Sequence, residues 1–156
     1  MMIHDLEITS EWVGSAVQSI DAVGIPVLSQ TEDIANARIR FRSGCVANLT
    51  ASRVSLEPLR KLRLFQSDAY ISIDFGANRI QVVRREGEPG GTLPVNIEAE
   101  TLDLDPADAL LAQDRAFAES VRARTKPLVS GRDGFRALEL ALRVQESLTP
   151  LEDDLA

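Results

Sequence analysis

Residues 33–54 read DIANARIRFRSGCVANLTASRV, and this stretch decides the fold class. Its first half alternates apolar and polar side chains, which is typical of a β-strand with one buried face. The apolar set is Ala35, Ala37, Ile39 and Phe41. Ser43-Gly44 then predicts a hairpin turn, after which residues 45–54 alternate again. The stretch predicts an antiparallel pair, with Cys45 facing the core as a small hydrophobe rather than a nucleophile.

Segments on both sides of this pair continue the pattern. Alternation predicts strands at residues 19–25, 61–66, 69–75, 79–85 and 92–104. Helical spacing predicts a short helix at residues 2–12 and two closing helices, one capped by Asp105 and one beginning near Ser130. Since helices do not alternate with strands, the order predicts an α+β fold. We expect an open, mostly antiparallel β-sheet with helices packed on one face.

Composition excludes several functions. The 156 residues favour one domain, and the net charge of -7 argues against a general nucleic-acid or anionic-membrane binder. One cysteine and one histidine exclude an internal disulfide, a cysteine zinc cage and a two-histidine metal site. No apolar run is long enough to span a membrane and no secretory signal is visible, so a cytoplasmic location is expected. No metal site is expected.

Two residues are candidates for a functional site. His4, beside Asp5, could be a general base, a ligand or a surface residue, and the residues alone favour the surface. Arg53 ends the second strand of the pair and could bind a phosphate or carboxylate through two hydrogen bonds, or could simply be solvated. The polar face of the sheet, rich in Asn, Thr, Ser and Arg, is either exposed to solvent or an oligomer interface.

Four segments carry a resemblance to a known family. They are MIHDLE at residues 2–7, DIANAR at 33–38, SGCVANLTASR at 43–53 and KPLVSGRDG at 126–134. In this order they resemble the Gfo/Idh/MocA oxidoreductases, which are NAD(P)-dependent sugar dehydrogenases. The resemblance implies an N-terminal Rossmann domain for the nicotinamide cofactor and a C-terminal α+β domain, similar to that of glyceraldehyde-3-phosphate dehydrogenase, that shapes the substrate site and the subunit interface.

The resemblance makes residues 1–156 a single C-terminal substrate and oligomerisation domain without the cofactor domain. It implies that His4 matches the active-site histidine that acts on the substrate hydroxyl, while Arg53 is a candidate substrate contact. The expected ligand is a sugar or nucleotide sugar, and the expected partner is a second copy in a homodimer or higher homo-oligomer through the open sheet face. NAD or NADP is implied for a full-length relative, with none bound by this chain alone.

Departures from the family pattern leave an alternative open. The aspartate that the family places one helical turn before the histidine would precede Met1, and the glycine-rich turn and the lysine of the family's EKP motif are missing. These departures suggest a truncated chain that is inactive by itself. The alternative is a non-catalytic binding or self-association module, and coding sequence upstream of Met1 would separate the two. A small enzyme of another kind would need a catalytic set that one histidine and one cysteine do not make.

Overall fold

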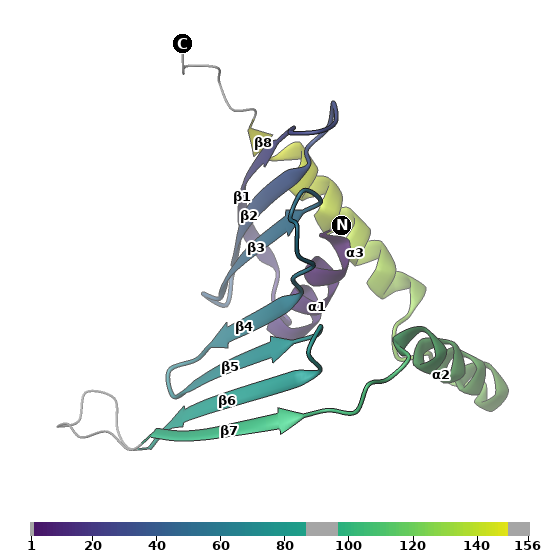
Figure 1. The fold of residues 1–156 in the computed structure, drawn as a ribbon. Helices are drawn as coiled ribbons and strands as arrows, with labels where there is room; N and C mark the ends of the chain where they lie inside the picture. Colours follow the sequence, from purple (N-terminus) through teal and green to yellow (C-terminus); the bar gives the residue numbers. More distant parts are fainter. Residues whose placement is uncertain (1, 87–96, 150–156) are drawn as a thin grey trace, which may run out of the picture. The chain divides into compact units, whose positions relative to one another are not determined.

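The computed structural model describes residues 2–86 and 97–149, which divide into two compact units (Figure 1). The first unit contains Met1–Ser55 and Ala116–Ala156, and the second contains Leu56–Arg115. The helices are α1 (Ile3–Val13), α2 (Ala109–Ala123) and α3 (Gly131–Glu146). The strands are β1 (Val17–Ile25), β2 (Ile34–Phe41), β3 (Val46–Ser52), β4 (Lys61–Phe65), β5 (Ala69–Asp74), β6 (Arg79–Arg85), β7 (Ile97–Asp103) and β8 (Leu148–Thr149).

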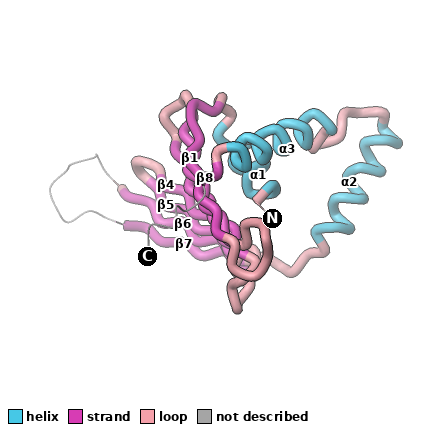
Figure 2. Tube along the Cα trace, turned by 90° about the horizontal axis from the view of Figure 1, so that it is seen from above, coloured by secondary structure: helices cyan, strands magenta, loops and turns pink. Residues whose placement is uncertain are grey.

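The first unit is a four-stranded sheet in the order β3-β2-β1-β8, with two helices on one face. All pairs are antiparallel except β1 with β8. Helices α1 and α3 pack against each other and lie on the same side of the sheet (Figure 2). The core between them contains Leu6, Ile39, Phe41, Leu140 and Val144. The predicted pair of strands around residues 33–54 is therefore confirmed, with its apolar face toward the helices.

The hairpin turn corrects the prediction for Cys45. Gly44 adopts a positive φ of 88°, which glycine reaches without strain. Strand β3 begins at Val46, and Cys45 is exposed rather than in the core. The reason is that Cys45 still belongs to the turn, where its carbonyl accepts a hydrogen bond from the Phe41 N–H at 2.9 Å, so strand alternation does not decide where its side chain points.

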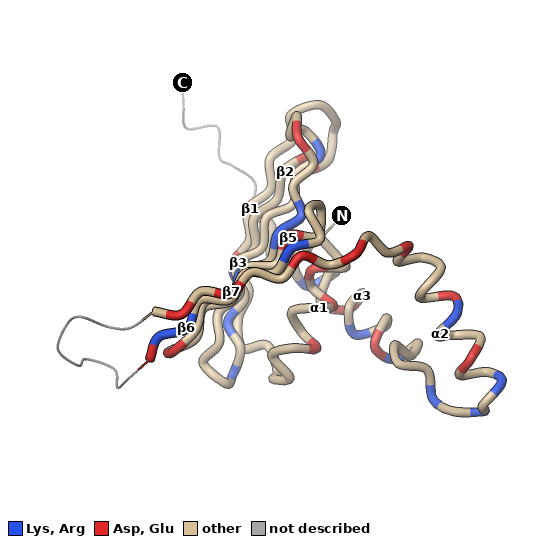
Figure 3. Tube along the Cα trace, turned by 60° about the horizontal axis from the view of Figure 1, so that its bottom comes forward, with Lys and Arg blue, Asp and Glu red and all other residues tan. Residues whose placement is uncertain are grey.

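The second unit is an antiparallel sheet in the order β4-β5-β6-β7. Lys61, Asp74, Arg79 and Asp103 stand opposite one another across its four strands. Two ion pairs join them, Lys61–Asp74 at 2.9 Å and Arg79–Asp103 at 2.6 Å. Basic and acidic positions are interspersed along these strands (Figure 3). The residues on the four strands are exposed or half-buried, so this sheet holds no fully buried residue among those described.

The closing helices differ from each other. Helix α3 begins as predicted, and the Asp133 carboxylate accepts hydrogen bonds from the Ser130 N–H at 2.8 Å and hydroxyl at 2.6 Å. Helix α2 begins later than expected, because Asp108 rather than Asp105 accepts the hydrogen bond from the N–H of Leu111, at 3.0 Å. Of these two closing helices, only α3 covers the first sheet as predicted, whereas the apolar stripe of α2 is exposed. That stripe contains Leu110, Leu111, Phe117 and Val121.

The α+β fold class and the mostly antiparallel open sheets are thus confirmed, although the strands form two sheets rather than one. The first five positions of the strand predicted at residues 92–104 lie outside the described residues, and β7 covers the described part, Ile97–Asp103. None of the described helices is long and apolar enough to cross a membrane.

Candidate functional site

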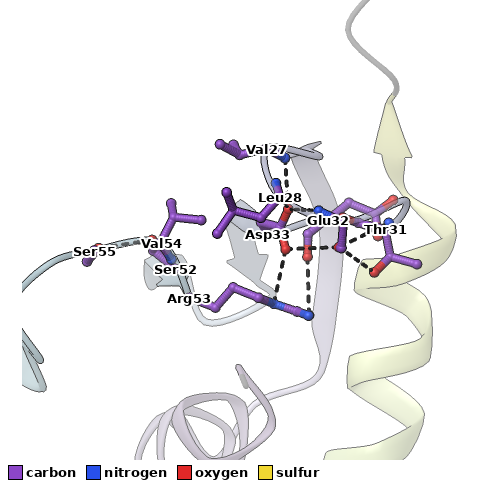
Figure 4. Close-up of polar contacts among 10 residues, drawn as sticks. Val27, Leu28, Thr31, Glu32, Asp33, Ser52, Arg53, Val54 and Ser55 are labelled. Carbon is purple, nitrogen blue, oxygen red and sulfur yellow. Dashed lines mark hydrogen bonds and ion pairs between the residues drawn. The ribbon is translucent and has the colours of Figure 1, made fainter.

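A buried carboxylate organises the loop between β1 and β2. Pro26 ends β1, and the chain then folds around Asp33, whose side chain has no exposed area. The Oδ2 atom of Asp33 accepts hydrogen bonds from three successive backbone N–H groups, those of Val27 at 2.8 Å, Leu28 at 2.6 Å and Ser29 at 2.8 Å (Figure 4). Its Oδ1 atom accepts one from the Ser29 hydroxyl at 2.9 Å. The loop therefore closes on a single charged group.

These donors hold Asp33 in its ionised form. The N–H of Leu28, followed by those of Val27 and Ser29, lowers the pKa of Asp33 far below its ordinary value of 3.8, and this effect outweighs the opposing effect of burial. A carboxylate that accepts several backbone hydrogen bonds stays charged, because protonation would leave its donors without an acceptor. Asp33 is thus a fixed negative charge at neutral pH.

Arg53 lies one residue beyond β3 and contacts this loop at three points. Its backbone N–H donates to the Asp33 carbonyl at 2.9 Å. Its side chain places Nε 3.4 Å from Asp33 Oδ1, while Nη2 donates to the Glu32 carbonyl at 3.5 Å (Figure 4). Half of the side chain, 50%, remains exposed. Arg53 is therefore held by the loop on one side, while the rest of its side chain remains accessible to solvent.

His4 lies in the first turn of α1. One side of this helix is buried through Leu6 and Thr9, and Met2 just before the helix is also buried, so the helix is fixed to the core while His4 is exposed. The His4 side chain makes no hydrogen bond or ion pair with a described residue. Helix α1 packs near β3, the strand that Arg53 follows, so both candidates belong to the first unit. No hydrogen bond or ion pair joins them.

The polar face of the first sheet lies opposite the helices. Neighbouring strands align Asn36 with Thr50 and Arg38 with both Asp21 and Asn48. The Thr50 hydroxyl donates to Asn36 Oδ1 at 2.7 Å, and Arg38 Nη1 donates to Asn48 Oδ1 at 3.4 Å. A shallow depression on this face is lined by these five residues together with Val23, Ala37 and Leu49. Side chains of this face thus hydrogen-bond to one another, and the depression between them is open.

Sequence reasoning missed Asp33, which it treated only as the start of a strand. A signal was present, because an aspartate four residues after Ser29, at the end of a polar loop, is suited to accept local backbone hydrogen bonds. Gly24 supports the same loop, since a Cβ at this position would collide with the side chain of Glu32. The described residues contain no cluster of three or more His, Cys, Asp or Glu that could hold a metal ion.

Comparisons with known proteins place this geometry among dehydrogenases. No protein-family model matches the chain. It is 36% identical over 147 residues to a UDP-N-acetylglucosamine 3-dehydrogenase of Acidithiobacillus ferrooxidans, a match that covers 93% of this chain and 46% of the relative. A solved structure of that enzyme superimposes with a TM-score of 0.84 at 34% identity, covering 94% of this chain and 45% of the other.

More distant structures share the fold. Levoglucosan dehydrogenase, solved with NADH and L-sorbose, gives a TM-score of 0.75 at 15% identity over 94% of this chain and 46% of that one. The WlbA dehydrogenase of Bordetella pertussis, solved with NADH and UDP-GlcNAcA, gives 0.65 at 15% identity over 94% of this chain and 40% of that one. The chain thus spans about half the length of the relatives it matches.

Helices on one face of an open, mostly antiparallel sheet are the arrangement that this chain shares with the C-terminal half of the matched dehydrogenase. The chain belongs to the Gfo/Idh/MocA family, as the four sequence segments predicted.

Proposed function

We propose that this chain is the substrate-binding and oligomerisation domain of an NAD(P)-dependent dehydrogenase that acts on a nucleotide sugar. The observation that carries the proposal is the 36% identity to a UDP-N-acetylglucosamine 3-dehydrogenase over 93% of the chain. The substrate class suggested by that relative, a uridine diphosphate sugar, combines a hydroxyl to be oxidised with an anionic diphosphate. The chain carries one candidate residue for each of these groups.

His4 is our candidate for the reacting hydroxyl. An imidazole exchanges protons near neutral pH, so it can accept the hydroxyl proton while the carbon–oxygen bond becomes a carbonyl. Its exposed position at the start of a helix fixed by Leu6 supports this role, because the ring is accessible while its backbone is held. A bound nicotinamide supplies the hydride acceptor for such a reaction.

The described residues do not fit a nicotinamide cofactor. A dinucleotide-binding fold needs parallel strands joined by helices and a glycine-rich turn before a helix. Here the only parallel pairing among the described strands is the two-residue contact of β8 with β1. The cofactor must therefore be held by protein outside these residues, and we expect no turnover by the 156-residue chain alone.

Arg53 is our candidate for the diphosphate. Guanidinium groups bind phosphate oxygens through two parallel hydrogen bonds, and half of the Arg53 side chain is exposed for such a contact. The net charge of -7 makes a local cation important, since the chain as a whole repels anions.

The polar face of the first sheet is our candidate for self-association. Asp21 and Arg38 lie opposite each other on adjacent strands, so a second copy related by a two-fold axis could meet each charge with its opposite. The alternative function, a non-catalytic self-association module, would use the same face without His4 or Arg53.

A chimera tests the proposal. Residues 1–156 are joined to the half of the Acidithiobacillus enzyme that this chain does not cover, and oxidation of UDP-N-acetylglucosamine is followed through formation of reduced nicotinamide cofactor. We expect turnover that falls by about 100- to 10,000-fold in His4→Asn, as expected for loss of a general base. Glu11→Gln, an exposed change in the last turn of α1, is the control and should leave turnover unchanged. A His4→Asn chimera as active as its parent would refute the role of His4.

A further inference from the structure

We propose that Asp33 is a positioning residue for the ligand: its buried carboxylate orients the guanidinium of Arg53 so that the outer edge of that group faces the diphosphate. The inference rests on the proposed function, in which Arg53 contacts a nucleotide sugar. It adds Asp33 to the two candidate residues named above, His4 and Arg53, and the effect of Asp33 on binding passes through the side chain of Arg53.

The two oxygens of Asp33 have different tasks. Oδ2 receives the three backbone N–H groups of residues 27–29 and thereby closes the loop. Oδ1 receives the Ser29 hydroxyl and lies 3.4 Å from Arg53 Nε. Because the carboxylate is buried and its donors are fixed, Oδ1 has a defined place from which to orient the guanidinium. A solvated surface carboxylate would have no such place.

The contacts of Arg53 all fall on one edge of its guanidinium. Nε faces Asp33 Oδ1, and Nη2 donates one hydrogen to the Glu32 carbonyl. A guanidinium carries five N–H donors in a planar fork, so the outer edge formed by Nη1 and the second hydrogen of Nη2 remains for a ligand. Nη1 makes no hydrogen bond with a described residue. That edge has the spacing for two phosphate oxygens.

The backbone on both sides of the Arg53 side chain is also held. On one side its N–H donates to the Asp33 carbonyl at 2.9 Å. On the other, the Ser55 hydroxyl donates to Ser52 Oγ at 2.9 Å and the Val54 N–H donates to the same oxygen at 3.3 Å (Figure 4). A long arginine side chain loses much rotamer freedom when it binds, and orientation before binding reduces that loss. The arrangement is therefore suited to binding rather than to stability alone.

Binding of UDP-N-acetylglucosamine to the 156-residue chain, measured by titration calorimetry, tests the inference. Arg53→Gln and Asp33→Asn should each weaken binding by about tenfold, and the double variant should bind no more weakly than Arg53→Gln alone. In Asp33→Asn the single amide oxygen can still accept the loop N–H groups. The amide NH₂ group then faces Arg53 Nε, and because both groups are donors, no hydrogen bond can form between them. The matched control is Ser29→Ala, which removes the other contact of Oδ1 and should change affinity by less than about twofold.

A second measurement does not depend on the ligand. The Nε–H resonance of Arg53, observed by NMR, should exchange slowly with water in the parent and in Ser29→Ala, and rapidly in Asp33→Asn. If Arg53→Gln weakens binding while Asp33→Asn neither weakens it nor alters the Nε–H exchange, the positioning role is wrong and the proposed function stands. If neither the parent nor any variant binds the nucleotide sugar, the proposed binding function fails, and the exchange measurement alone decides whether Asp33 orients Arg53.

Discussion

Leu6→Ala should destabilise the first unit more than any surface leucine does. Leu6 is 1% exposed in the face of α1 that packs on the sheet, so its side chain leaves water almost completely on folding. Truncation removes about three methylene equivalents at about 0.8 kcal/mol each, or about 2.4 kcal/mol of transfer free energy. The cavity left in the core cluster that also contains Ile39 and Phe41 raises the expected loss in the free energy of unfolding to about 3–4 kcal/mol. The loss should detach α1, and with it His4.

The assay is urea unfolding followed through the fluorescence of Trp12, the only tryptophan of the chain, which lies on α1 and reports on this unit. The matched control is Leu142→Ala on α3, since this leucine is 49% exposed and should cost only about 1 kcal/mol. A Leu6→Ala protein no less stable than Leu142→Ala would refute the packing of α1 on which the site depends.

Three further predictions concern the loop, the turn and the sheet face. Because the folded pKa of Asp33 is depressed, its contribution to the free energy of unfolding is present above the ordinary pKa of 3.8 and is lost as pH falls below that value; urea titrations in acid should show a shallower decline for Asp33→Asn than for the parent. Exposed Cys45 should react with a thiol reagent as fast in the folded chain as in urea. Slower labelling in the folded chain would mean that Cys45 is buried, as strand alternation predicted. Arg38→Glu should convert a self-associated chain to monomer by light scattering, while Arg63→Glu, exposed on β4, should not; equal behaviour of the two variants would exclude the polar face as the interface.

Much of the fold could be predicted because strand alternation and helix capping are local. Residues 33–42 place apolar side chains at every second position, and burial of Ala37, Ile39 and Phe41 follows directly from that order. Ser130 likewise predicts the start of α3, since a cap needs only residues within one turn, and the structure adds Asp133 as the partner of Ser130 in that cap. Where the local pattern ends, the prediction fails, as Cys45 shows at the edge of a strand.

The division of the strands into two sheets was not predictable in the same way. Alternation indicates which residues share a face, but hydrogen bonding between strands depends on which edges meet, and this is a long-range property of the chain. The parallel contact of β8 with β1 joins residues that lie more than a hundred positions apart, Ala22 with Leu148. No local signal in the two-residue strand identifies that partner.

The candidate site illustrates the same limit with a functional consequence. His4 and Arg53 could be chosen from the sequence because their side chains carry recognisable chemistry. For Asp33 the sequence gives a local signal for the loop hydrogen bonds of residues 27–29, but it does not show the guanidinium of Arg53 that the fold brings to the same carboxylate. Acidic residues outnumber basic ones by 24 to 17 in this chain, and composition alone does not distinguish the one that holds an arginine. A positioning residue that acts through a second side chain can be identified only once the fold shows which side chain it contacts. For this reason the test compares Asp33→Asn, which changes the contact of Oδ1 with Arg53, with Ser29→Ala, which removes the other contact of the same oxygen.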